Sequence, residues 1–372
     1  MPAPVGPGKL ERVKSMQAVT VTPGQRDSLR VRDIPDVQAG EGQVAVRVLQ
    51  AGLCGTDAEI TAGLYGAAPA GSPYLVLGHE NLGLVESAPA GSGLSAGGLV
   101  VSTVRRPCPE ACLPCRSGEN DMCLTGHYLE RGIQGLHGFM SERYVEDPRH
   151  VVPVPSSLRP LAILVEPMTV AQKALEQTFC IQGRMSWAPR QAVVLGAGPV
   201  GMLAAAAMRI RGLEVTVASR EAEGSARDAL LREAGIGYMS TAGTSVEDLP
   251  ARLGSIDLVL EATGAAAVIA PALSILGRDG VCVLASVTDV GRQWQIDLGA
   301  WNREMVLGNR LVFGSVNAAR RHFEAAVRDL VTAEERLPGW MGRLVTRRLP
   351  FTDAVRALVR DPADIKTVLD FG

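Results

Sequence analysis

Four cysteines that fall within sixteen residues are the strongest chemical signal in the sequence. Their spacing is Cys-x3-Cys-x2-Cys-x7-Cys, and the prolines and the glycine near them favour turns that bring the side chains together. Four thiolates in one short loop match a closed tetrahedral zinc site, which is structural because no position is left for water or substrate. Four unrelated cysteines are the alternative. The residues are Cys108, Cys112, Cys115 and Cys123.

A second group of potential metal ligands is dispersed along the chain. Taken singly, these residues have ordinary explanations: a small buried cysteine, a core histidine and an exposed acid at a helix start. Taken together, a thiolate, an imidazole and carboxylates can hold zinc and leave one position open for a substrate oxygen. Separation along the chain does not determine separation in space, so both interpretations stay open at this point. The residues are Cys54, His79, Glu80 and Glu166.

The segment 196–201 (GAGPVG) lies directly after the apolar run 192–195 and opens an alanine-rich stretch. A dinucleotide-binding glycine motif requires this context of strand, turn and helix. Gly196 would permit the tight turn, Gly198 the approach of a pyrophosphate, and Gly201 close packing of the helix on the strand. The helix N-terminus would offer N–H donors to the phosphates. A chance glycine turn in an Ala- and Gly-rich chain is the alternative.

The end of the next expected strand indicates which cofactor is bound. An NAD site typically carries an acid there for the ribose hydroxyls, whereas this chain has Ser219 and Arg220. A small hydroxyl followed by a guanidinium suits a 2′-phosphate, so the sequence favours NADP. Glu221 follows immediately and keeps NAD open if its side chain points inward. Arg220 as a solvated surface charge is the alternative.

The chain that must position these residues has two parts with different sequence patterns. Up to about residue 160, short apolar runs between Gly, Pro and Ser clusters indicate strands and long loops. From residue 191, strands alternate with helices at the spacing of βαβ units, which predicts a parallel sheet between helical layers. We expect strands at 192–195, 214–218, 256–261 and 281–285, helices at about 199–212, 223–234 and 267–277, and, near the C-terminus, helices at 322–332 and 352–360 around an extended segment at 344–349.

The predicted fold class is therefore α/β, with a doubly wound, Rossmann-type domain inserted into a loop-rich, mostly-β domain. The first domain is expected to span 1–170 and 318–372 and to carry the zinc lobe at about 105–125. The inserted domain is expected at 171–317. The C-terminal segment is expected to pack back on the first domain.

The length of 372 residues independently favours two domains. With 47% hydrophobic and 20% charged residues and a net charge of -2, a disordered chain, a collagen-like chain and a nucleic-acid binder that works by charge are excluded. The apolar stretches are too short for a membrane-spanning helix, and the N-terminus lacks the apolar core of a signal peptide. We expect a cytoplasmic protein without nucleic-acid or membrane partners.

In combination, the motifs resemble the zinc-dependent medium-chain dehydrogenases. The resemblance rests on the segments CGTD and GHE around the dispersed ligands, the four-cysteine lobe and the late glycine motif. It extends from about residue 16 to the C-terminus and implies a GroES-like catalytic domain around the Rossmann domain. Four further segments narrow it to the glucose 1-dehydrogenase branch: 103–108 (TVRRPC), 130–133 (ERGI), 137–140 (HGFM) and 165–168 (VEPM).

The resemblance implies two zinc ions per chain, one catalytic and one structural. Cys54, His79 and Glu166 would hold the catalytic zinc, with Glu80 either a ligand or next to the ligands. Thr56 would pass a proton from the substrate hydroxyl. The side chains in contact with the sugar would be Thr56, Glu130, Glu166 and Asn317. The cofactor would contact Gly196, Gly198, Pro199, Val200, Gly201, Ser219, Arg220, Ala285, Ser286, Val287, Ser315, Val316 and Asn317.

The activity implied is oxidation of the C1 hydroxyl of an aldose to the lactone, with hydride transfer to NADP, in a homodimer or homotetramer. The chain departs from the branch in the cysteine lobe, where three residues instead of two separate the first two cysteines. Val104 and Val170 also stand where some glucose dehydrogenases carry sugar-binding polar side chains. An apolar replacement relaxes or redirects specificity, so a polyol, cyclitol or secondary alcohol stays an alternative substrate.

Two alternatives come from other functional classes. A catalytically inactive nucleotide-binding sensor is disfavoured by the retained ligand types and Thr56. A zinc hydrolase would leave the dinucleotide motif unexplained.

Overall fold

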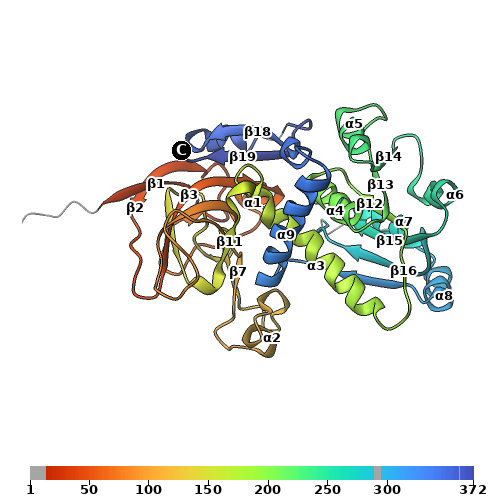
Figure 1. The fold of residues 1–372 in the computed structure, drawn as a ribbon, viewed down its shortest axis with the longest axis horizontal. Helices are drawn as coiled ribbons and strands as arrows, with labels where there is room; N and C mark the ends of the chain where they lie inside the picture. Colours follow the sequence, from red (N-terminus) through yellow and green to blue (C-terminus); the bar gives the residue numbers. More distant parts are fainter. Residues whose placement is uncertain (1–13, 289–294, 360) are drawn as a thin grey trace, which may run out of the picture.

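The computed structural model describes residues 14–288, 295–359 and 361–372. Figure 1 shows two domains side by side, with the long helices α3 (Val165–Gln182) and α9 (Arg320–Arg336) between them. Blue strands from the C-terminal part lie with the red and orange strands of the first domain, whereas green and cyan segments build the second. The expected boundary at residue 170 falls inside α3, which packs on α9, on α4 (Pro199–Ile210) and on the first domain's β5 (Glu80–Ser87).

The first domain is built around β3 (Val44–Leu53), which lies inside a sheet with the order β11-β6-β5-β3-β19-β18 and also pairs with β10. Along β3, Val44, Val46 and Val48 face one buried cluster and Leu49, Ala51 and Leu53 another, with a register shift between Val48 and Gln50. Both faces of this strand are therefore covered. The other strands are β5 (Glu80–Ser87), β6 (Leu99–Ser102), β10 (Arg143–Glu146), β11 (Val151–Val154), β18 (Val345–Pro350) and β19 (Lys366–Asp370).

The C-terminal strand β19 pairs antiparallel with β3, with Val368 opposite Gly52. The expectation that the C-terminal segment packs on the first domain is therefore confirmed. The helix expected at 352–360 is shorter than predicted. The structure has the 3-10 turn η7 (Phe351–Asp353) and α10 (Ala354–Ala357), and residue 360 lies outside the described residues.

Smaller elements complete the first domain. A second sheet has the order β2-β1-β4, and α1 (Gly55–Thr61) begins directly after β3. The remaining bounds are β1 (Ser15–Val21), β2 (Arg30–Pro35), β4 (Leu75–Val76), η2 (Pro148–His150), η3 (Ser156–Leu158), η4 (Ala162–Leu164) and η6 (Met341–Leu344).

The cysteine lobe projects from the first domain near α3 and is labelled by α2 in Figure 1. Its small sheet has the order β7-β8-β9, and the register places Arg105 opposite Glu130. The elements of the lobe are β7 (Arg105–Arg106), α2 (Leu113–Arg116), η1 (Asn120–Met122), β8 (Leu129–Arg131) and β9 (Gly135–Leu136).

The second domain holds a parallel sheet with the order β14-β13-β12-β15-β16-β17, which is the strand order of a Rossmann domain. Its helices lie on both faces of the sheet. The strands are β12 (Gln191–Leu195), β13 (Glu214–Ser219), β14 (Gly237–Ser240), β15 (Ile256–Glu261), β16 (Leu276–Leu284) and β17 (Leu311–Gly314). The helical elements are α4 (Pro199–Ile210), α5 (Ala226–Glu233), η5 (Val246–Asp248), α6 (Leu249–Leu253), α7 (Ala266–Ser274) and α8 (Leu298–Gly308).

The expected α/β fold with an inserted Rossmann domain is confirmed, and the expected strands and helices of that domain are found with small shifts at their ends. The expected end of one helix, at residue 277, is wrong. Helix α7 stops at Ser274, and residues 276 and 277 already belong to β16. The short strands β14 and β17 were not expected from the sequence. Close packing at the centre comes from four consecutive alanines of α4, 204–207, which are fully buried.

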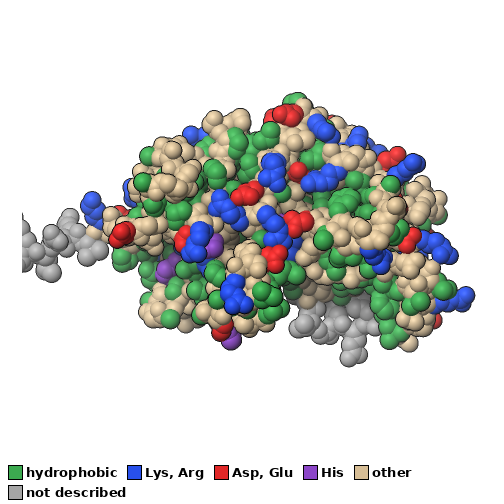
Figure 2. Space-filling model, turned by 60° about the horizontal axis from the view of Figure 1, so that its bottom comes forward, with side chains coloured by type: hydrophobic (Ala, Val, Ile, Leu, Met, Phe, Trp, Pro, Cys, Tyr) green, Lys and Arg blue, Asp and Glu red, His purple; other side chains and the backbone are tan. Residues whose placement is uncertain are grey.

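The surface carries a mixture of charges. Figure 2 shows Lys and Arg side chains interspersed with Asp and Glu over the face in view. Within the described residues, no helix has the length and hydropathy to cross a membrane.

Candidate functional site

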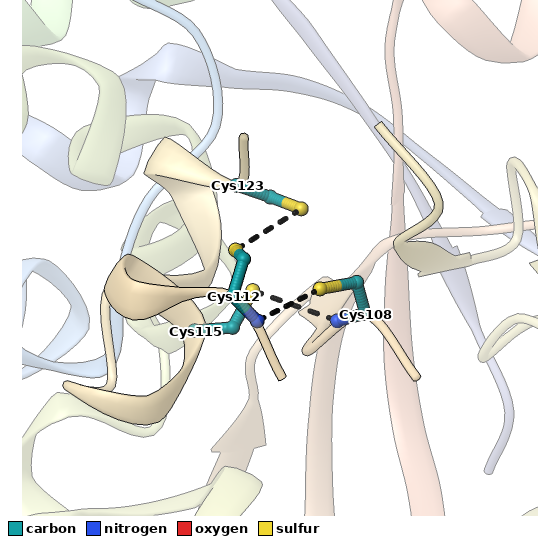
Figure 3. Close-up of side chains that lie close together, drawn as sticks. All are labelled: Cys108, Cys112, Cys115 and Cys123. Carbon is teal, nitrogen blue, oxygen red and sulfur yellow. Dashed lines mark hydrogen bonds between the residues drawn. The ribbon is translucent and has the colours of Figure 1, made fainter. Parts of the chain in front are cut away.

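The four lobe cysteines converge in space. Their sulfurs all lie within 4.8 Å of one another, and Figure 3 shows the side chains directed toward a common centre. The Sγ atoms of Cys112 and Cys123 are 3.9 Å apart. A tetrahedral zinc with Zn–S bonds of about 2.3 Å would place its sulfurs roughly 3.8 Å apart, so the donor set fits a closed zinc site.

Backbone N–H groups prepare these sulfurs to carry negative charge. The amide of Cys112 donates to Cys108 Sγ at 3.4 Å, and the amide of Leu124 donates to Cys112 Sγ at 3.5 Å. Although burial raises the pKa of Cys123, hydrogen bonds from Thr125 and nearby amides lower it to about 6. The extra residue between Cys108 and Cys112 is accommodated by Ala111, whose φ is 48°, so the longer spacing still lets the sulfurs meet.

The dispersed ligands come together because β3 and β5 are neighbours. Gly52 of β3 pairs with Glu80 of β5, so Cys54, two residues after Gly52, lies beside His79. The Cys54 Sγ is 3.0 Å from His79 Nε2. Cys54 is also the N-cap of α1, and its sulfur accepts a hydrogen bond from the amide of Thr56 at 3.3 Å.

His79 belongs to two overlapping groups of potential ligands. One contains Cys54, Asp57 and His79, and the other contains His79, Glu80 and Glu166, each with its atoms within 4.8 Å. Glu166 reaches this position from the first turn of α3. A thiolate, an imidazole and a carboxylate are the donors that an open, catalytic zinc site uses, so the residues present fit the ion.

Burial makes this concentration of acids electrostatically unfavourable without a cation. It raises the pKa of Glu166 to about 7 and also raises the pKa of Asp57. Burial alone would lower the pKa of His79, but the neighbouring Cys54 and Asp57 raise it well above its usual value. Asp57 Oδ1 and His79 Nδ1 are buried without a hydrogen-bond partner among the described residues, 3.7 Å apart. The Asp57 carboxylate also accepts the Cys54 amide at 2.9 Å.

Glu80 is engaged by a buried lysine. Lys366 of β19 pairs with the Glu80 carboxylate and donates to the Leu53 carbonyl at 2.9 Å. Only 1% of each residue is exposed. A Cβ at Gly52 would overlap the Glu80 carboxylate, so glycine there leaves room for the pair. In this structure the acid therefore balances a buried cation while it lies close to His79.

Thr56 lies in the first turn of α1 and is partly exposed beside Cys54. Its hydroxyl has no hydrogen-bond partner within the part of the chain that the structure describes. The side chain is therefore free to contact a substrate hydroxyl.

Glu130 and Asn317 meet across the junction of the two domains. Asn317 Nδ2 donates to Glu130 Oε1 at 2.7 Å. Asn317 has φ of 58°, which asparagine tolerates, and its Oδ1 accepts the Ala318 amide at 2.7 Å. The predicted sugar contacts Glu130 and Asn317 thus form one polar pair, whereas Val104 is buried in the apolar core.

The glycine motif has the geometry that the sequence predicts. Gly196 has φ of 110°, and a Cβ there would lie 3.0 Å from the Ala262 carbonyl oxygen. A Cβ at Gly201 would overlap the carbonyl of Gly196, so α4 packs on β12 only with glycine at 201. A Cβ at Gly198 would meet nothing within 4 Å, which leaves open space at the N-terminus of α4. Pro199 and Val200 form the first turn of this helix.

At the end of β13, where the sequence predicts that the cofactor is selected, the arginine side chain is open to solvent. Ser219 Oγ hydrogen bonds with the Tyr238 hydroxyl at 2.7 Å, and Arg220 is exposed. Glu221 does not compete with a ligand for Arg220, because its side chain pairs with Arg227 of α5. This arrangement favours a phosphate over ribose hydroxyls at the strand end.

The two other predicted cofactor loops, 285–287 and 315–317, follow the neighbouring strands β16 and β17. Ser286 donates to the buried Glu261 carboxylate at 2.5 Å and accepts the Gly264 amide at 2.8 Å. The Ser315 amide donates to the Leu284 carbonyl at 2.9 Å. Ala285 and Val287 flank Ser286, and Val287 is 87% exposed. The predicted cofactor contacts in 285–287 and 315–317 thus lie along one edge of the sheet.

Several residues of the site were not predicted from the sequence. Asp57 carried a signal, since Cys54-x-x-Asp57 is the spacing of a capping box. Lys173 and Lys366 are two of four lysines in the chain, and both are almost fully buried. Arg105 carried no local signal of its partners, because Glu130 and Asp121 belong to other elements of the lobe. Glu261 accepts the amides of Thr263 and Gly264, a loop contact that no motif in the sequence marks.

Comparisons with known proteins agree with this geometry. Residues 159–371 match the family model described as the glucose dehydrogenase C-terminus, and residues 40–156 match the alcohol dehydrogenase GroES-like domain. A glucose 1-dehydrogenase of Methanocella arvoryzae is 42% identical over 360 residues, covering 96% of this chain and 100% of that protein. One from Thermoproteus tenax is 42% identical over 358 residues, covering 95% and 99%.

Solved structures give the same result. The glucose dehydrogenase of Haloferax mediterranei in complex with NADP, Zn and gluconolactone superposes with a TM-score of 0.88 at 34% identity, covering 96% of this chain and 99% of that one. An alcohol dehydrogenase of Thermotoga maritima has a TM-score of 0.81 at 25% identity, covering 96% and 99%. The chain therefore belongs to the zinc-dependent medium-chain dehydrogenases, in their glucose dehydrogenase family.

Proposed function

We propose that this enzyme oxidises the C1 hydroxyl of an aldose such as glucose to the lactone and transfers the hydride to NADP. The observation that carries the proposal is the pairing of Glu130 with Asn317 in a chain that also brings Cys54 and His79 together. A sugar is recognised through its hydroxyls, and this pair offers both an acceptor and a donor. The similar Haloferax mediterranei enzyme was solved with NADP, Zn and gluconolactone.

Cys54, His79 and Glu166 would hold the catalytic zinc, and the four lobe cysteines would hold the structural zinc. A zinc ion bound by three protein ligands acts as a Lewis acid that makes a substrate hydroxyl more acidic. Glu80 would stay beside these ligands, paired with Lys366, and orient His79 through the local charge.

The protein's own contribution to proton transfer would come from Thr56. Its hydroxyl lacks a competing partner among the described residues and lies in the same helical turn as the Cys54 cap. It can accept the proton of the substrate hydroxyl while it donates its own toward solvent. The carboxylate of Glu130 and the amide of Asn317 would hold the ring in place, so that C1 faces the nicotinamide.

The cofactor would lie over the glycine motif, with its pyrophosphate at the N-terminus of α4 and the open side of Gly198. Arg220, exposed at the end of β13, would bind the 2′-phosphate of NADP. The engagement of Glu221 by Arg227 supports NADP over NAD, because the carboxylate that would favour NAD is already paired.

One observation favours a second candidate substrate. Val104 is 3% exposed and belongs to the apolar core, so this position offers no hydrogen bond to a sugar hydroxyl. A polyol or cyclitol without a hydroxyl directed at position 104 would lose no binding energy relative to an aldose at this position.

The test is to follow the absorbance of reduced nicotinamide with purified, zinc-replete protein. NADP and NAD are each combined with glucose, galactose, xylose, sorbitol and myo-inositol. We expect NADP reduction by aldoses with lactone as product. Activity with sorbitol or myo-inositol alone would replace the substrate proposal by the second candidate, and activity with NAD alone would overturn the role of Arg220.

We also infer that the enzyme works in the cytoplasm as a homodimer or homotetramer. All seven cysteines are free of disulfides, which suits a reducing compartment. Light scattering coupled to size-exclusion chromatography would measure the assembly, and a monomeric mass would contradict the inference about it.

A further inference from the structure

A closed ring of polar contacts joins the cysteine lobe to the predicted sugar contacts. It passes through five segments: β7, the lobe turn η1 and β8, which lie within residues 105–131, and α3 and the loop after β17, which come later in the chain. Each link is a hydrogen bond or ion pair of 3.1 Å or less. The residues of this ring are Arg105, Asp121, Lys173, Val316, Asn317 and Glu130.

The first arm of the ring is Arg105, which is 6% exposed. Its Nε and Nη2 both lie 3.0 Å from Glu130 Oε1, and its Nη1 donates to the Asp121 carbonyl at 3.1 Å. The guanidinium also lies over the Tyr128 ring, with Cζ 3.6 Å from the centroid. A planar fork that makes these contacts simultaneously has essentially one orientation.

The second arm of the ring starts from the side chain of Asp121, whose backbone carbonyl ends the first arm. Asp121 Oδ2 pairs with Lys173 Nζ at 2.7 Å, and Lys173 is 2% exposed. The same Nζ donates to the Val316 carbonyl at 2.8 Å. Val316 immediately precedes Asn317, so the lysine holds the backbone from which the Asn317 amide reaches Glu130.

Both arms act on one carboxylate oxygen. Arg105 and Asn317 converge on Glu130 Oε1, and within the described residues no group hydrogen bonds to Oε2. A carboxylate whose first oxygen is fixed by three donor atoms presents its second oxygen in one direction. That oxygen is an acceptor only, which suits a ligand hydroxyl.

We propose that Arg105 and Asp121 are positioning residues for sugar binding, and that the cysteine lobe sets sugar affinity through them. They act through Glu130 and Asn317 and not by contact with the sugar. The inference rests on the proposed function, because it assumes that Glu130 Oε2 accepts a sugar hydroxyl. It gives the lobe a role in specificity in addition to the structural one that its zinc site implies.

The test compares two adjacent arginines of β7 in the full-length, zinc-replete enzyme. Arg105 pairs with Glu130, whereas Arg106 pairs with Glu146 on the other side of the strand. R105K keeps the charge but loses the fork and the stacking contact. R106K is the matched control, since it removes a comparable buried fork that does not touch Glu130.

For R105K we expect the KM for glucose to rise about ten- to hundredfold, the range that loss of a hydrogen bond to a charged group implies. The kcat and the KM for NADP are expected to stay within about twofold of the wild type. For R106K we expect a lower melting temperature and a KM for glucose within about twofold. Zinc content, measured by mass spectrometry, should be two ions per chain in both.

The second arm has its own variant. D121N/K173M removes both charges together, so no unpaired charge remains buried. It leaves the Asp121 backbone carbonyl for Arg105 but frees the Val316 carbonyl. We expect a rise of about three- to tenfold in the KM for glucose, and a combined effect with R105K smaller than the product, because both arms end on Glu130.

Three results would overturn the inference. They are an unchanged KM for glucose in R105K, an equal rise in R106K, and a fall in kcat at constant KM. A wild-type enzyme that fails to oxidise any aldose would instead overturn the proposed function, so the two failures are distinguishable.

Discussion

Buried charge dominates the chemistry of the individual residues. Asp57, Glu80 and Glu166 are gathered around His79, and Lys366 balances only one of the three acids. Burial raises the pKa of Glu166 to about 7, so a divalent cation at this point would stabilise the charged forms that the fold otherwise penalises. The buried negative charge and the types of donor atom therefore both indicate a zinc ion at this position.

Cys54 is the proposed zinc ligand whose removal should abolish catalysis. C54A removes the thiolate that lies 3.0 Å from His79, and we expect kcat to fall at least about a thousandfold with loss of the catalytic ion. The dissociation constant for NADP should change less than twofold, since the glycine motif lies in the other domain. C180A, which alters an exposed cysteine of α3, is the control. Retention of two zinc ions per chain in C54A would contradict the assignment.

The buried His150 should make the stability of the protein depend on pH. Burial and the nearby Arg106 lower the pKa of His150 to about 4, and its Nδ1 lies 3.3 Å from Thr103 Oγ1. The unfolded chain binds this proton near pH 6.5, so the stabilising contribution is complete above about 6.5 and is lost as the pH falls toward 4. H150N should therefore lose less free energy of unfolding than the wild type between pH 6.5 and 4. Urea unfolding at both pH values measures this, and parallel losses would exclude His150 as the titrating group.

Individual elements show which parts of the site were predictable from the sequence. The glycine motif and the cysteine lobe were predictable, because a tight turn and a site of four sulfurs both require a fixed local spacing of residues. The partners of Arg105 and Lys173 were not, because a long side chain gives no sign of which distant segment it will meet. The strands β14 and β17, with four residues each, lack the length for a periodic pattern.

At the end of β15, the buried Glu261 holds the loops beside the glycine motif. Its Oε1 accepts the Thr263 amide at 2.6 Å and the Gly264 amide at 3.2 Å, and its Oε2 accepts Ser286 Oγ. It thus ties together the loops that border the glycine motif. E261Q turns one acceptor into a donor, and we expect the KM for NADP to rise about five- to twentyfold while kcat changes little.

A control at the other end of the same strand separates positioning from stability. Asp257 Oδ2 accepts the amides of Arg190 at 2.7 Å and Gln191 at 3.0 Å, at the sheet edge opposite the glycine motif. D257N should lower the melting temperature without changing the KM for NADP. Equal KM values in E261Q and the wild type would show that Glu261 does not position the cofactor loops.

Across the whole molecule, the proposed cofactor and sugar sites depend on contacts between the domains. The helices α3 and α9 pack on each other between the two sheets, and Trp340 Nε1 donates to the Leu230 carbonyl of α5 at 2.7 Å. Arg227 of the same helix donates to the carbonyls of Pro362 and Asp364 at 2.8 Å. These contacts connect the Rossmann domain to the C-terminal segment, which contains β19 and supplies Lys366 as the partner of Glu80 beside the proposed zinc ligands.

We predict that the protein loses its zinc in two separate stages. The proposed ligand set of Cys54, His79 and Glu166 would leave one position on its zinc open, whereas the four lobe sulfurs would enclose their ion. A moderate chelator should therefore remove one zinc ion and abolish activity while the melting temperature falls only slightly, and added zinc should restore the activity. A thiol reagent that titrates the lobe cysteines should release the second ion and lower the melting temperature substantially, because the lobe contributes Asp121 to a buried ion pair with α3. Activity and melting temperature that decline together during the first stage would mean that the two sites are not independent.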